Sequence, residues 1–467
     1  MWSFHKPVAQ RADGVKNRVI LFFPAVDEPL SAKRKYQFPL SIVSLVPKLL
    51  KKKFRVHIFD ERLQFNCRER IEALLPDVVC FGVSSMTGFQ ILRAIEMVKF
   101  VRDRSSVPVV WGGWHTSLLP EQSANSEHVD YIVRGQGEET FSELAETLAN
   151  GARAADLKKV RGITFKREGK LVTIPARPVI PINELEPMPY SYFDVRKYRK
   201  YYSYMSSQGC PMHCGFCADA TVYNGKWFAL ESVRVVEELE YLVKRRTRHA
   251  NIIWFIDSNF FVNKQRVEEI CELILKKGLK FNWTAGGHPK QMARYDDHFF
   301  DLLHRSGCYR LLIGAESGSQ KILDYINKKA TVEDNLTFVR KTTRAKIQPD
   351  LSMMCGFPGA PEDDLRETIT FMNEIKSISP KAKIKLFFFT PYPGSPLYVE
   401  ALKQGYKPPD LLEGWAHYTL WQINMPYIDR NYEKLVRFFV EVYYRKYAGK
   451  DKLDWDKFVH LAHEANL

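Results

Sequence analysis

The sequence predicts an α/β protein in which a doubly wound, Rossmann-like domain precedes a partial (β/α)6, TIM-like barrel and a helical C-terminal tail. Two observations carry this prediction. Short, almost wholly apolar runs alternate with helical patterns in two separate regions, and a proline-rich stretch divides the regions. Apolar strands separated by helices are typical of parallel sheets covered on both faces. We expect domains at 1–150 and 196–400, a hairpin and linker at 151–195, and a helical segment at 401–467.

The composition is that of a globular protein in a reducing compartment. Of 467 residues, 45% are hydrophobic and 26% are charged, which allows roughly two to three domains. No apolar run reaches the roughly 18 residues of a membrane span, and the N-terminus lacks the apolar run of a signal peptide. Five of the eight cysteines are scattered singly, which argues against a disulfide framework. We therefore expect a cytoplasmic protein.

A formal net charge of +15 would suit anionic partners, but we interpret it first as a solvated basic surface. The densest basic cluster, "KLLKKKFR", falls at a predicted helix end, where lysines complement the helix dipole. No signature of a nucleic-acid-binding module is present, so we expect no nucleic-acid partner.

The first domain contains five apolar strands, predicted at 18–24, 54–60, 77–84, 107–113 and 130–135. In a doubly wound sheet, ligands bind outside the carboxyl ends of the strands. Small residues gather at these ends and are the candidate ligand contacts: Ser84, Ser85, Thr87, Gly112, Gly113, Gly135 and Gly137.

A hairpin turning at "REGK" and a proline-rich linker lead to the second domain. Its six strands are predicted at 201–209, 251–257, 281–287, 309–315, 347–356 and 384–390. Six β/α units favour a partial barrel with its site at the strand C-termini. The later segment "NYEKLVRFFVEVYYRKY" predicts an aromatic amphipathic helix. We expect this helix to dock on the barrel; contact with a membrane surface or a substrate is the alternative.

Three cysteines lie within eight residues, directly after the first barrel strand: Cys210, Cys214 and Cys217. Structural zinc takes four ligands, usually in two spaced pairs, and no second pair follows nearby, although His213 could be counted. Iron–sulfur clusters also take cysteine thiolates. Three thiolates on a four-iron cluster would leave one iron open to a substrate or cofactor.

The triad and several later segments resemble the radical S-adenosylmethionine superfamily. The pattern Cys-x-x-x-Cys-x-aromatic-Cys is followed in order by "FIDSNF", "LLIGAESGS", "MCGFPGAPEDD" and "FFFTPYPGSPLY". The upstream domain is similar to the cobalamin-binding domain that precedes many such barrels, through "YQFPLSIVSLVPKLLKK", "GVSSMTG", "WGGWHTSLLPEQ" and "VRGQGEETF". The family resembled is therefore the cobalamin-dependent radical S-adenosylmethionine enzymes, over roughly residues 18 to 400.

The resemblance implies three cofactors: a 4Fe-4S cluster on the cysteine triad, S-adenosyl-L-methionine, and cobalamin on the first domain. In this family the open iron chelates S-adenosylmethionine, and one electron cleaves it to a 5′-deoxyadenosyl radical. The family motifs place six further residues near the cluster or S-adenosylmethionine: Phe216, Asp257, Asn259, Glu316, Gly318 and Gly356. No catalytic side chain is assigned. For Cys308 and Cys355 we expect buried barrel positions rather than nucleophiles.

One departure from the family pattern concerns the cobalt ligand. Many cobalamin domains carry Asp-x-His-x-x-Gly, whose histidine ligates cobalt from below. The corresponding stretch here is "FDERLQFN", which has Arg62 at the histidine position and Phe65 at the glycine position. We therefore predict that cobalamin binds without this histidine; His115, on another loop, is the nearest alternative.

The resemblance favours a C-methyltransferase acting on an unactivated carbon of a lipid, a tetrapyrrole or another secondary metabolite. A cyclase, or an oxidative or ring-contracting enzyme, is the rival reading. Two other classes fit less well. A methylthiotransferase would need a second set of cysteines in its N-terminal domain. A non-catalytic cobalamin sensor would not need a cluster with an open iron. The expected partners are a small-molecule substrate and an electron donor such as flavodoxin or ferredoxin, with peripheral membrane contact left open.

Overall fold

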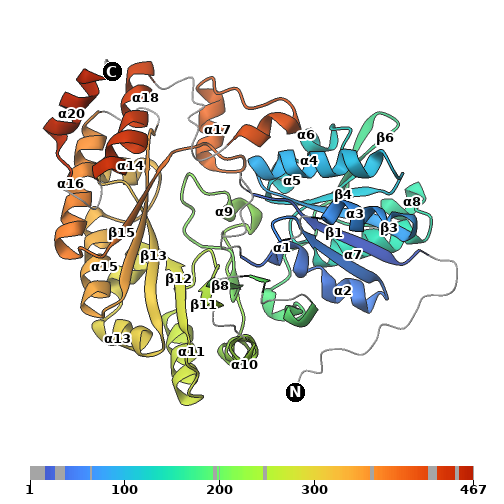
Figure 1. The fold of residues 1–467 in the computed structure, drawn as a ribbon, viewed down its shortest axis with the longest axis horizontal. Helices are drawn as coiled ribbons and strands as arrows, with labels where there is room; N and C mark the ends of the chain where they lie inside the picture. Colours follow the sequence, from blue (N-terminus) through green and yellow to red (C-terminus); the bar gives the residue numbers. More distant parts are fainter. Residues whose placement is uncertain are drawn as a thin grey trace. The chain divides into compact units, whose positions relative to one another are not determined.

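The computed structural model describes residues 16–26, 37–63, 66–192, 197–198, 200–245, 250–357, 362–418, 429–447 and 452–465. The chain divides into two compact units (Figure 1). The first comprises Met1–Tyr201 together with Pro408–Thr419, and the second comprises Tyr202–Lys407 and Leu420–Leu467. A short segment near the C-terminus therefore belongs to the first unit, which no local pattern in the sequence indicated.

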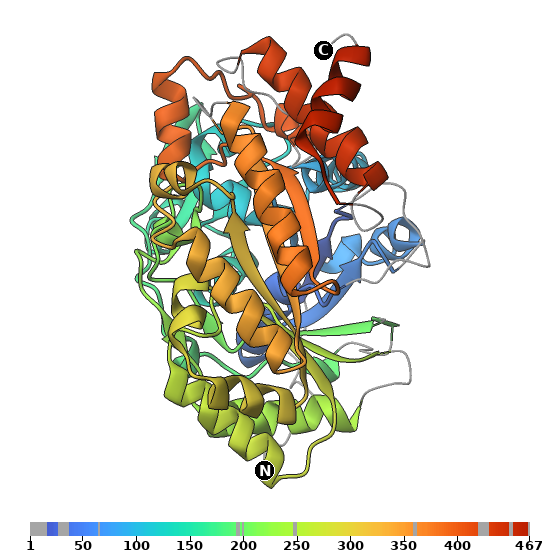
Figure 2. The same ribbon diagram turned by 90° about the vertical axis from the view of Figure 1, so that its left-hand side faces the viewer.

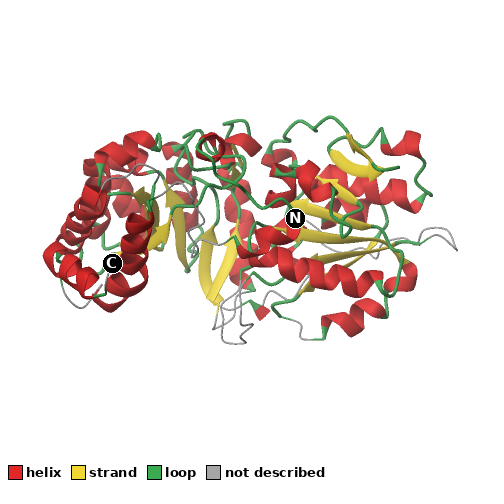
Figure 3. Ribbon diagram, turned by 90° about the horizontal axis from the view of Figure 1, so that it is seen from above, coloured by secondary structure: helices red, strands yellow, loops and turns green. Residues whose placement is uncertain are grey.

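The first unit contains a seven-stranded sheet with the order β2-β1-β3-β4-β5-β6-β7. Its strands are β1 Arg18–Phe23, β2 Arg55–Asp60, β3 Val78–Ser85, β4 Val109–Gly113, β5 Tyr131–Val133, β6 Ile163–Arg167 and β7 Lys170–Thr173. Strands β1 to β5 are parallel to one another. Strand β6 pairs antiparallel with β5, and β7 pairs antiparallel with β6. All eight residues of β3 are buried, because helices cover both faces of the sheet (Figure 3).

The helices of this unit are α1 Leu40–Val43, α2 Val46–Lys51, α3 Cys67–Glu72, α4 Phe89–Arg102, α5 Trp114–Leu118, α6 Pro120–Ala124, α7 Gly137–Ala149 and α8 Ala154–Leu157. The predicted hairpin is β6–β7. Its two-residue turn has positive φ at Glu168 (51°) and Gly169 (76°), the geometry that matches the twist of paired strands.

The basic cluster at the end of α2 is paired with acidic side chains. Lys48 pairs with Glu139, Lys51 with Glu186, and Lys52 with Glu146. These three lysines therefore bind neighbouring parts of the same unit.

The second unit contains a six-stranded sheet with the order β15-β14-β13-β12-β11-β8. Its strands are β8 Lys200–Tyr204, β11 Ala250–Phe255, β12 Asn282–Gly287, β13 Cys308–Glu316, β14 Gln348–Cys355 and β15 Lys383–Phe388. From β11 to β15 each neighbouring pair is parallel. Strands in sequential order, with helices between them, form the predicted partial barrel, which Figure 2 shows from its helix-covered side.

The intervening helices are α9 Asp219–Val222, α10 Ser232–Lys244, α11 Lys264–Lys276, α12 Pro289–Arg294, α13 Asp297–Arg305, α14 Gln320–Tyr325, α15 Val332–Arg344, α16 Glu362–Ile378 and α17 Pro396–Lys403.

The predicted first barrel strand is divided in two. It comprises β8 and a separate short strand, β9 Ser207–Gln208, which pairs antiparallel with β10 Phe228–Ala229. The carboxylate of Asp257 accepts hydrogen bonds from the backbone N–H of Ser206 (2.7 Å) and from the hydroxyls of Ser206 and Ser207 (both 2.6 Å). These bonds fix the chain where it leaves β8 and enters β9.

The C-terminal segment docks on the barrel, as predicted. Helix α18 Arg430–Arg437 continues through a π-helical turn at Phe438–Tyr443 into α19 Tyr444–Tyr447, and α20 Trp455–Glu464 follows. The hydroxyl of Tyr444 donates to the carbonyl of Ile384 in β15 (2.7 Å). Among the described residues, no helix combines the length and apolar character needed to cross a bilayer.

Candidate functional site

The cysteine loop begins immediately after β9. Gly209 has φ +80°, and a Cβ there would lie 2.1 Å from the carbonyl oxygen of Lys226, so only glycine fits. Cys214 is buried, Cys210 and Cys217 are half-buried, and the N–H of Cys217 donates to the carbonyl of Cys214 (3.1 Å). The turn thus brings all three cysteines onto one tight loop.

The three thiols are close enough to interact electrostatically. Burial raises the pKa of each thiol, and that of Cys217 to about 12. The charge of Cys214 raises the pKa of the other two, and Cys210 also raises that of Cys217. Within the described parts of the chain, no three His, Cys, Asp or Glu side chains converge on one metal ion. Iron–sulfur clusters are held by cysteine thiolates, and the donor set on this loop is of that kind.

Two polar side chains lie beside the thiols. Asn259, predicted from its motif, lowers the pKa of Cys210, against the larger effect of burial, and donates to Gln291 (2.7 Å). Asp219 was missed. Its buried carboxylate accepts from the hydroxyl of Ser258 (2.8 Å), and its charge raises the pKa of Cys210. The sequence signal was present, because this aspartate stands two residues after the last cysteine.

Asp257 contacts the chain segment that precedes the cysteine loop. Both of its carboxylate oxygens are engaged by Ser206 and Ser207. Burial outweighs these bonds and raises its pKa. Asp257 thus holds the start of the cysteine loop, and its contact with S-adenosylmethionine stays a prediction.

The predicted residues on β13 and β14 have different roles. Glu316 ends β13 with φ +66° and forms an ion pair with Lys328 (2.8 Å), whose ammonium lies 5.4 Å from the ring centroid of Phe216. At Gly318, a Cβ would lie 2.7 Å from the Cβ of Phe371, so helix packing explains this glycine. The sixth candidate, Gly356, follows β14 with φ +86°.

In the first unit, the predicted small residues gather at the carboxyl edge of the sheet. Ser84 pairs with Gly112, and Ser85 pairs with Gly113. A Cβ on Gly113 would lie 2.4 Å from the carbonyl oxygen of Ser85, whereas one on Gly135 would meet nothing within 4 Å. Gly113 is therefore packed closely against the end of β3, whereas Gly135 has open space beside it.

Gly135 and Gly137 are the glycines that border this edge of the sheet. The hydroxyl of Ser117 donates to the carbonyl of Gly113 (2.6 Å) and accepts from the N–H of Gly135 (2.9 Å), which ties two loops together. Gly137 begins α7, where a Cβ would lie 3.0 Å from a methyl carbon of Leu45.

His115 lies at the same edge under an aromatic cover. Its Nδ1 shares a 3.0 Å hydrogen bond with the hydroxyl of Thr87, and burial lowers its pKa to about 4, so the ring is neutral. Its Nε2 is buried and has no hydrogen-bond partner among the described residues. The indole of Trp415 lies 5.4 Å from the ring, and the N–H of Gly88 donates to the carbonyl of Trp415 (3.1 Å). Sequence reasoning missed Trp415, which is distant along the chain.

Arg62 is engaged by a buried carboxylate. Its Nε and Nη2 donate to the two oxygens of Asp60 (2.8 and 2.6 Å), and Nη2 also donates to the carbonyl of Gln37 (2.8 Å). The hydroxyl of Tyr198 donates to the same carboxylate (2.9 Å). Phe65, the other residue that departs from the Asp-x-His-x-x-Gly pattern, lies outside the described residues.

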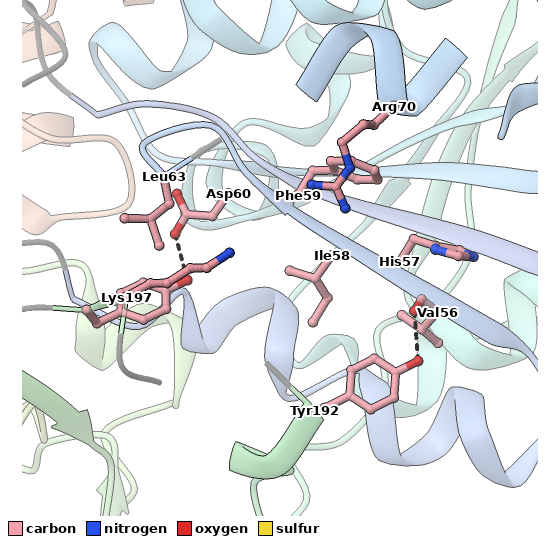
Figure 4. A pocket seen from close by; sticks show the side chains of 10 residues that line it. Val56, His57, Ile58, Phe59, Asp60, Leu63, Arg70, Tyr192 and Lys197 are labelled. Carbon is pink, nitrogen blue, oxygen red and sulfur yellow. Dashed lines mark hydrogen bonds between the residues drawn. The ribbon is translucent and has the colours of Figure 1, made fainter. Parts of the chain in front are cut away.

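A pocket of about 250 Å³ opens beside this pair, along the outer edge of β2 (Figure 4). The side chains of His57, Arg70 and Lys197 line it, and the hydroxyl of Tyr192 donates to the carbonyl of Val56 on its floor (2.7 Å). Burial and three nearby arginines lower the pKa of His57.

Comparison with known proteins agrees with both units. Residues 34–145 match the B12 binding domain, and residues 204–372 match the radical SAM superfamily. An uncharacterized methyltransferase of Pyrococcus horikoshii is 28% identical over 74% of this chain and 72% of its own length. The anaerobic magnesium-protoporphyrin IX monomethyl ester cyclase of Rubrivivax gelatinosus is 26% identical over 71% of this chain and 60% of its own length.

Among solved structures, the cobalamin-dependent S-adenosylmethionine radical enzyme OxsB, with aqua-cobalamin and S-adenosylmethionine bound, superposes with a TM-score of 0.74. The identity is 18%, over 96% of this chain and 70% of that chain. The two proteins therefore share a fold.

A cobalamin-binding domain followed by a radical S-adenosylmethionine domain defines a class of enzymes. The chain belongs to the cobalamin-dependent radical S-adenosylmethionine enzymes. Its cofactors are a 4Fe-4S cluster, S-adenosylmethionine and cobalamin. The cluster and S-adenosylmethionine supply radical chemistry; the protein binds and orients them.

We predict that cobalamin binds to this protein without a histidine on cobalt. Arg62 occupies the ligand position and is held by Asp60, and His115 is packed against Trp415. The Co(II) form should therefore show no nitrogen superhyperfine splitting in electron paramagnetic resonance, and His115→Ala should leave the spectrum unchanged. Splitting that disappears in His115→Ala would contradict this placement.

Proposed function

We propose that the protein is a radical S-adenosylmethionine C-methyltransferase that methylates an unactivated carbon of a small molecule. The observation that carries the proposal is the presence in one chain of a tight thiol triad and a glycine-rich cofactor edge on a B12-binding domain. In this reaction class one S-adenosylmethionine supplies the methyl group and a second supplies the radical.

The residues take distinct roles in the proposal. Cys210, Cys214 and Cys217 hold the cluster, and Asn259 lies beside Cys210. Phe216, Glu316 and Gly356 border the S-adenosylmethionine site, with Asp257 and Gly318 supporting it from behind. The cobalamin face is formed by the small residues Ser84, Ser85, Thr87, Gly112, Gly113, Gly135 and Gly137.

A lipid or tetrapyrrole fits the aromatic-rich, basic composition, with 13% aromatic residues and a net charge of +15. A low-potential flavodoxin or ferredoxin would deliver the electrons. A cyclase without methyl transfer is the second candidate, because the relative from Rubrivivax gelatinosus carries that name and matches 71% of this chain.

The two products of S-adenosylmethionine distinguish the candidates. Protein reconstituted with iron, sulfide and cobalamin is incubated anaerobically with dithionite and a panel of tetrapyrroles and lipids. Methyl transfer predicts S-adenosylhomocysteine and 5′-deoxyadenosine in about equal amounts. With the true substrate, 5′-deoxyadenosine without S-adenosylhomocysteine would exclude methyl transfer and favour the cyclase. The matched control, Cys214→Ala, should make no 5′-deoxyadenosine.

A further inference from the structure

A lysine that no sequence motif indicated lies beside the cysteine triad. Lys328 follows α14, and its side chain is 6% exposed. Its ammonium forms a 2.8 Å ion pair with Glu316, whose side chain is also 6% exposed, and lies over the ring of Phe216 in the cysteine loop. A buried charge needs a partner, and here the partner is one carboxylate next to several thiols.

Strand β13 leaves room for this pair. A Cβ on Gly314 would lie 1.9 Å from Oε1 of Glu316 and 2.9 Å from Nζ of Lys328. Any larger residue would thus occupy the position of the ion pair, which explains a glycine inside a strand.

The backbone around Lys328 is held in an uncommon conformation. Asn327 has φ +51°, Lys329 has φ +54° and Glu316 has φ +66°, all in the left-handed region. Non-glycine residues stay there only where surrounding contacts impose it, and such residues cluster at functional sites. Lys328 is therefore flanked on both sides by left-handed backbone.

The same turn is attached to the cysteine loop. The N–H of Gly215 donates to the carbonyl of Ile326 (2.8 Å), and the side chain of Asn327 donates to the carbonyl of His213 (2.9 Å). These bonds fix the position of Lys328 relative to the thiols.

The charge of Lys328 lies next to the cysteine loop. Its ammonium is paired with the carboxylate of Glu316 and lies 5.4 Å from the ring centroid of Phe216, the residue that precedes Cys217. The neighbouring His288 has a pKa lowered to about 3 by burial and by Lys328, and it adds no second positive charge.

We propose that Lys328 is a positioning residue that supplies a fixed positive charge to the iron–sulfur cluster and raises its reduction potential. A cation beside the cluster stabilises the state that has gained an electron. The inference rests on the cluster and is independent of whether methyl transfer follows. It adds a residue to the cluster site that the cysteine motif does not contain.

The test is a redox titration of the reconstituted cluster without substrate, followed by electron paramagnetic resonance. Lys328→Gln keeps a donor for Glu316 but removes the charge. It should disfavour reduction at least tenfold, which for one electron is a shift of about 59 mV to more negative potential. Lys328→Arg keeps the charge and should stay close to the wild type. The matched control, Lys329→Met, removes the charge of an exposed neighbour and should shift the potential much less. A Lys328→Gln potential equal to that of the wild type overturns the proposal.

A second measurement does not depend on how well Lys328→Gln folds. In protein labelled with nitrogen-15 at lysine, electron–nuclear double resonance of the reduced cluster should detect a lysine nitrogen. The coupling should persist in Lys329→Met and disappear in Lys328→Arg. If the wild type shows no such coupling, or if Lys328→Arg retains it, the assignment is wrong. Because neither measurement uses substrate, these outcomes are separate from failure of the methyltransferase proposal.

Discussion

Replacing Cys210, Cys214 and Cys217 together by alanine will remove the iron–sulfur cluster and abolish cleavage of S-adenosylmethionine. The three thiols share one loop and interact with one another, and each is expected to bind one iron. Anaerobically reconstituted wild type should contain about four irons and four sulfides per chain, and the variant none. Iron and sulfide assays, with the visible absorption of the cluster, measure this directly.

The matched control replaces three other cysteines of the same unit, Cys271, Cys308 and Cys355, which are buried and do not belong to the loop. This variant should retain about four irons, since none of these thiols belongs to the triad. Stoichiometric zinc without iron in the wild type, or equal iron in both triple variants, would contradict the assignment.

Replacing Arg62 by methionine will destabilise the first unit by about 3–5 kcal/mol. Asp60 and Arg62 form a buried pair, with side chains 3% and 5% exposed. Methionine leaves the carboxylate of Asp60 buried without its cation, although the hydroxyl of Tyr198 still donates to it. Amide hydrogen exchange of peptides from β1 and β2 reports the free energy of opening this sheet alone.

The double variant Asp60→Asn, Arg62→Met is the control for that loss. Removing both charges leaves no unpaired carboxylate, so most of the stability should return. If Arg62→Met and the double variant are equally destabilised, packing of the arginine against the ring of Phe23 (4.4 Å), and not the ion pair, governs the loss.

Much of the fold could be predicted because its signals are local. Strands such as β1 and β3 are buried on both faces and therefore appear as apolar runs, and their ends agree with the prediction to within one or two residues. The triad is visible in the sequence because its three cysteines lie within eight residues, and their binding of a cluster stays a prediction. Asn259 stands in a family motif, and its contact with a cofactor also stays a prediction.

Other features depend on contacts between distant segments and leave no local pattern. Trp415 covers His115 from a segment 300 residues away along the chain. Lys328 reaches Glu316 through a turn whose left-handed residues are not glycines. The division of the first barrel strand depends on Asp257, a carboxylate from another strand end. In each case the contact is made by tertiary packing between distant segments. The periodicity of apolar residues along the sequence carries no information about such contacts.

Transfer of an isotopically labelled methyl group tests the proposed activity most directly. The reconstituted enzyme is given S-adenosylmethionine deuterated in its methyl group, together with the substrate, and the product is analysed by mass spectrometry. The account predicts a product that carries the deuterated methyl group on carbon, and no such product from Cys214→Ala. A substrate that is consumed with formation of 5′-deoxyadenosine, while its product carries no label, would contradict methyl transfer.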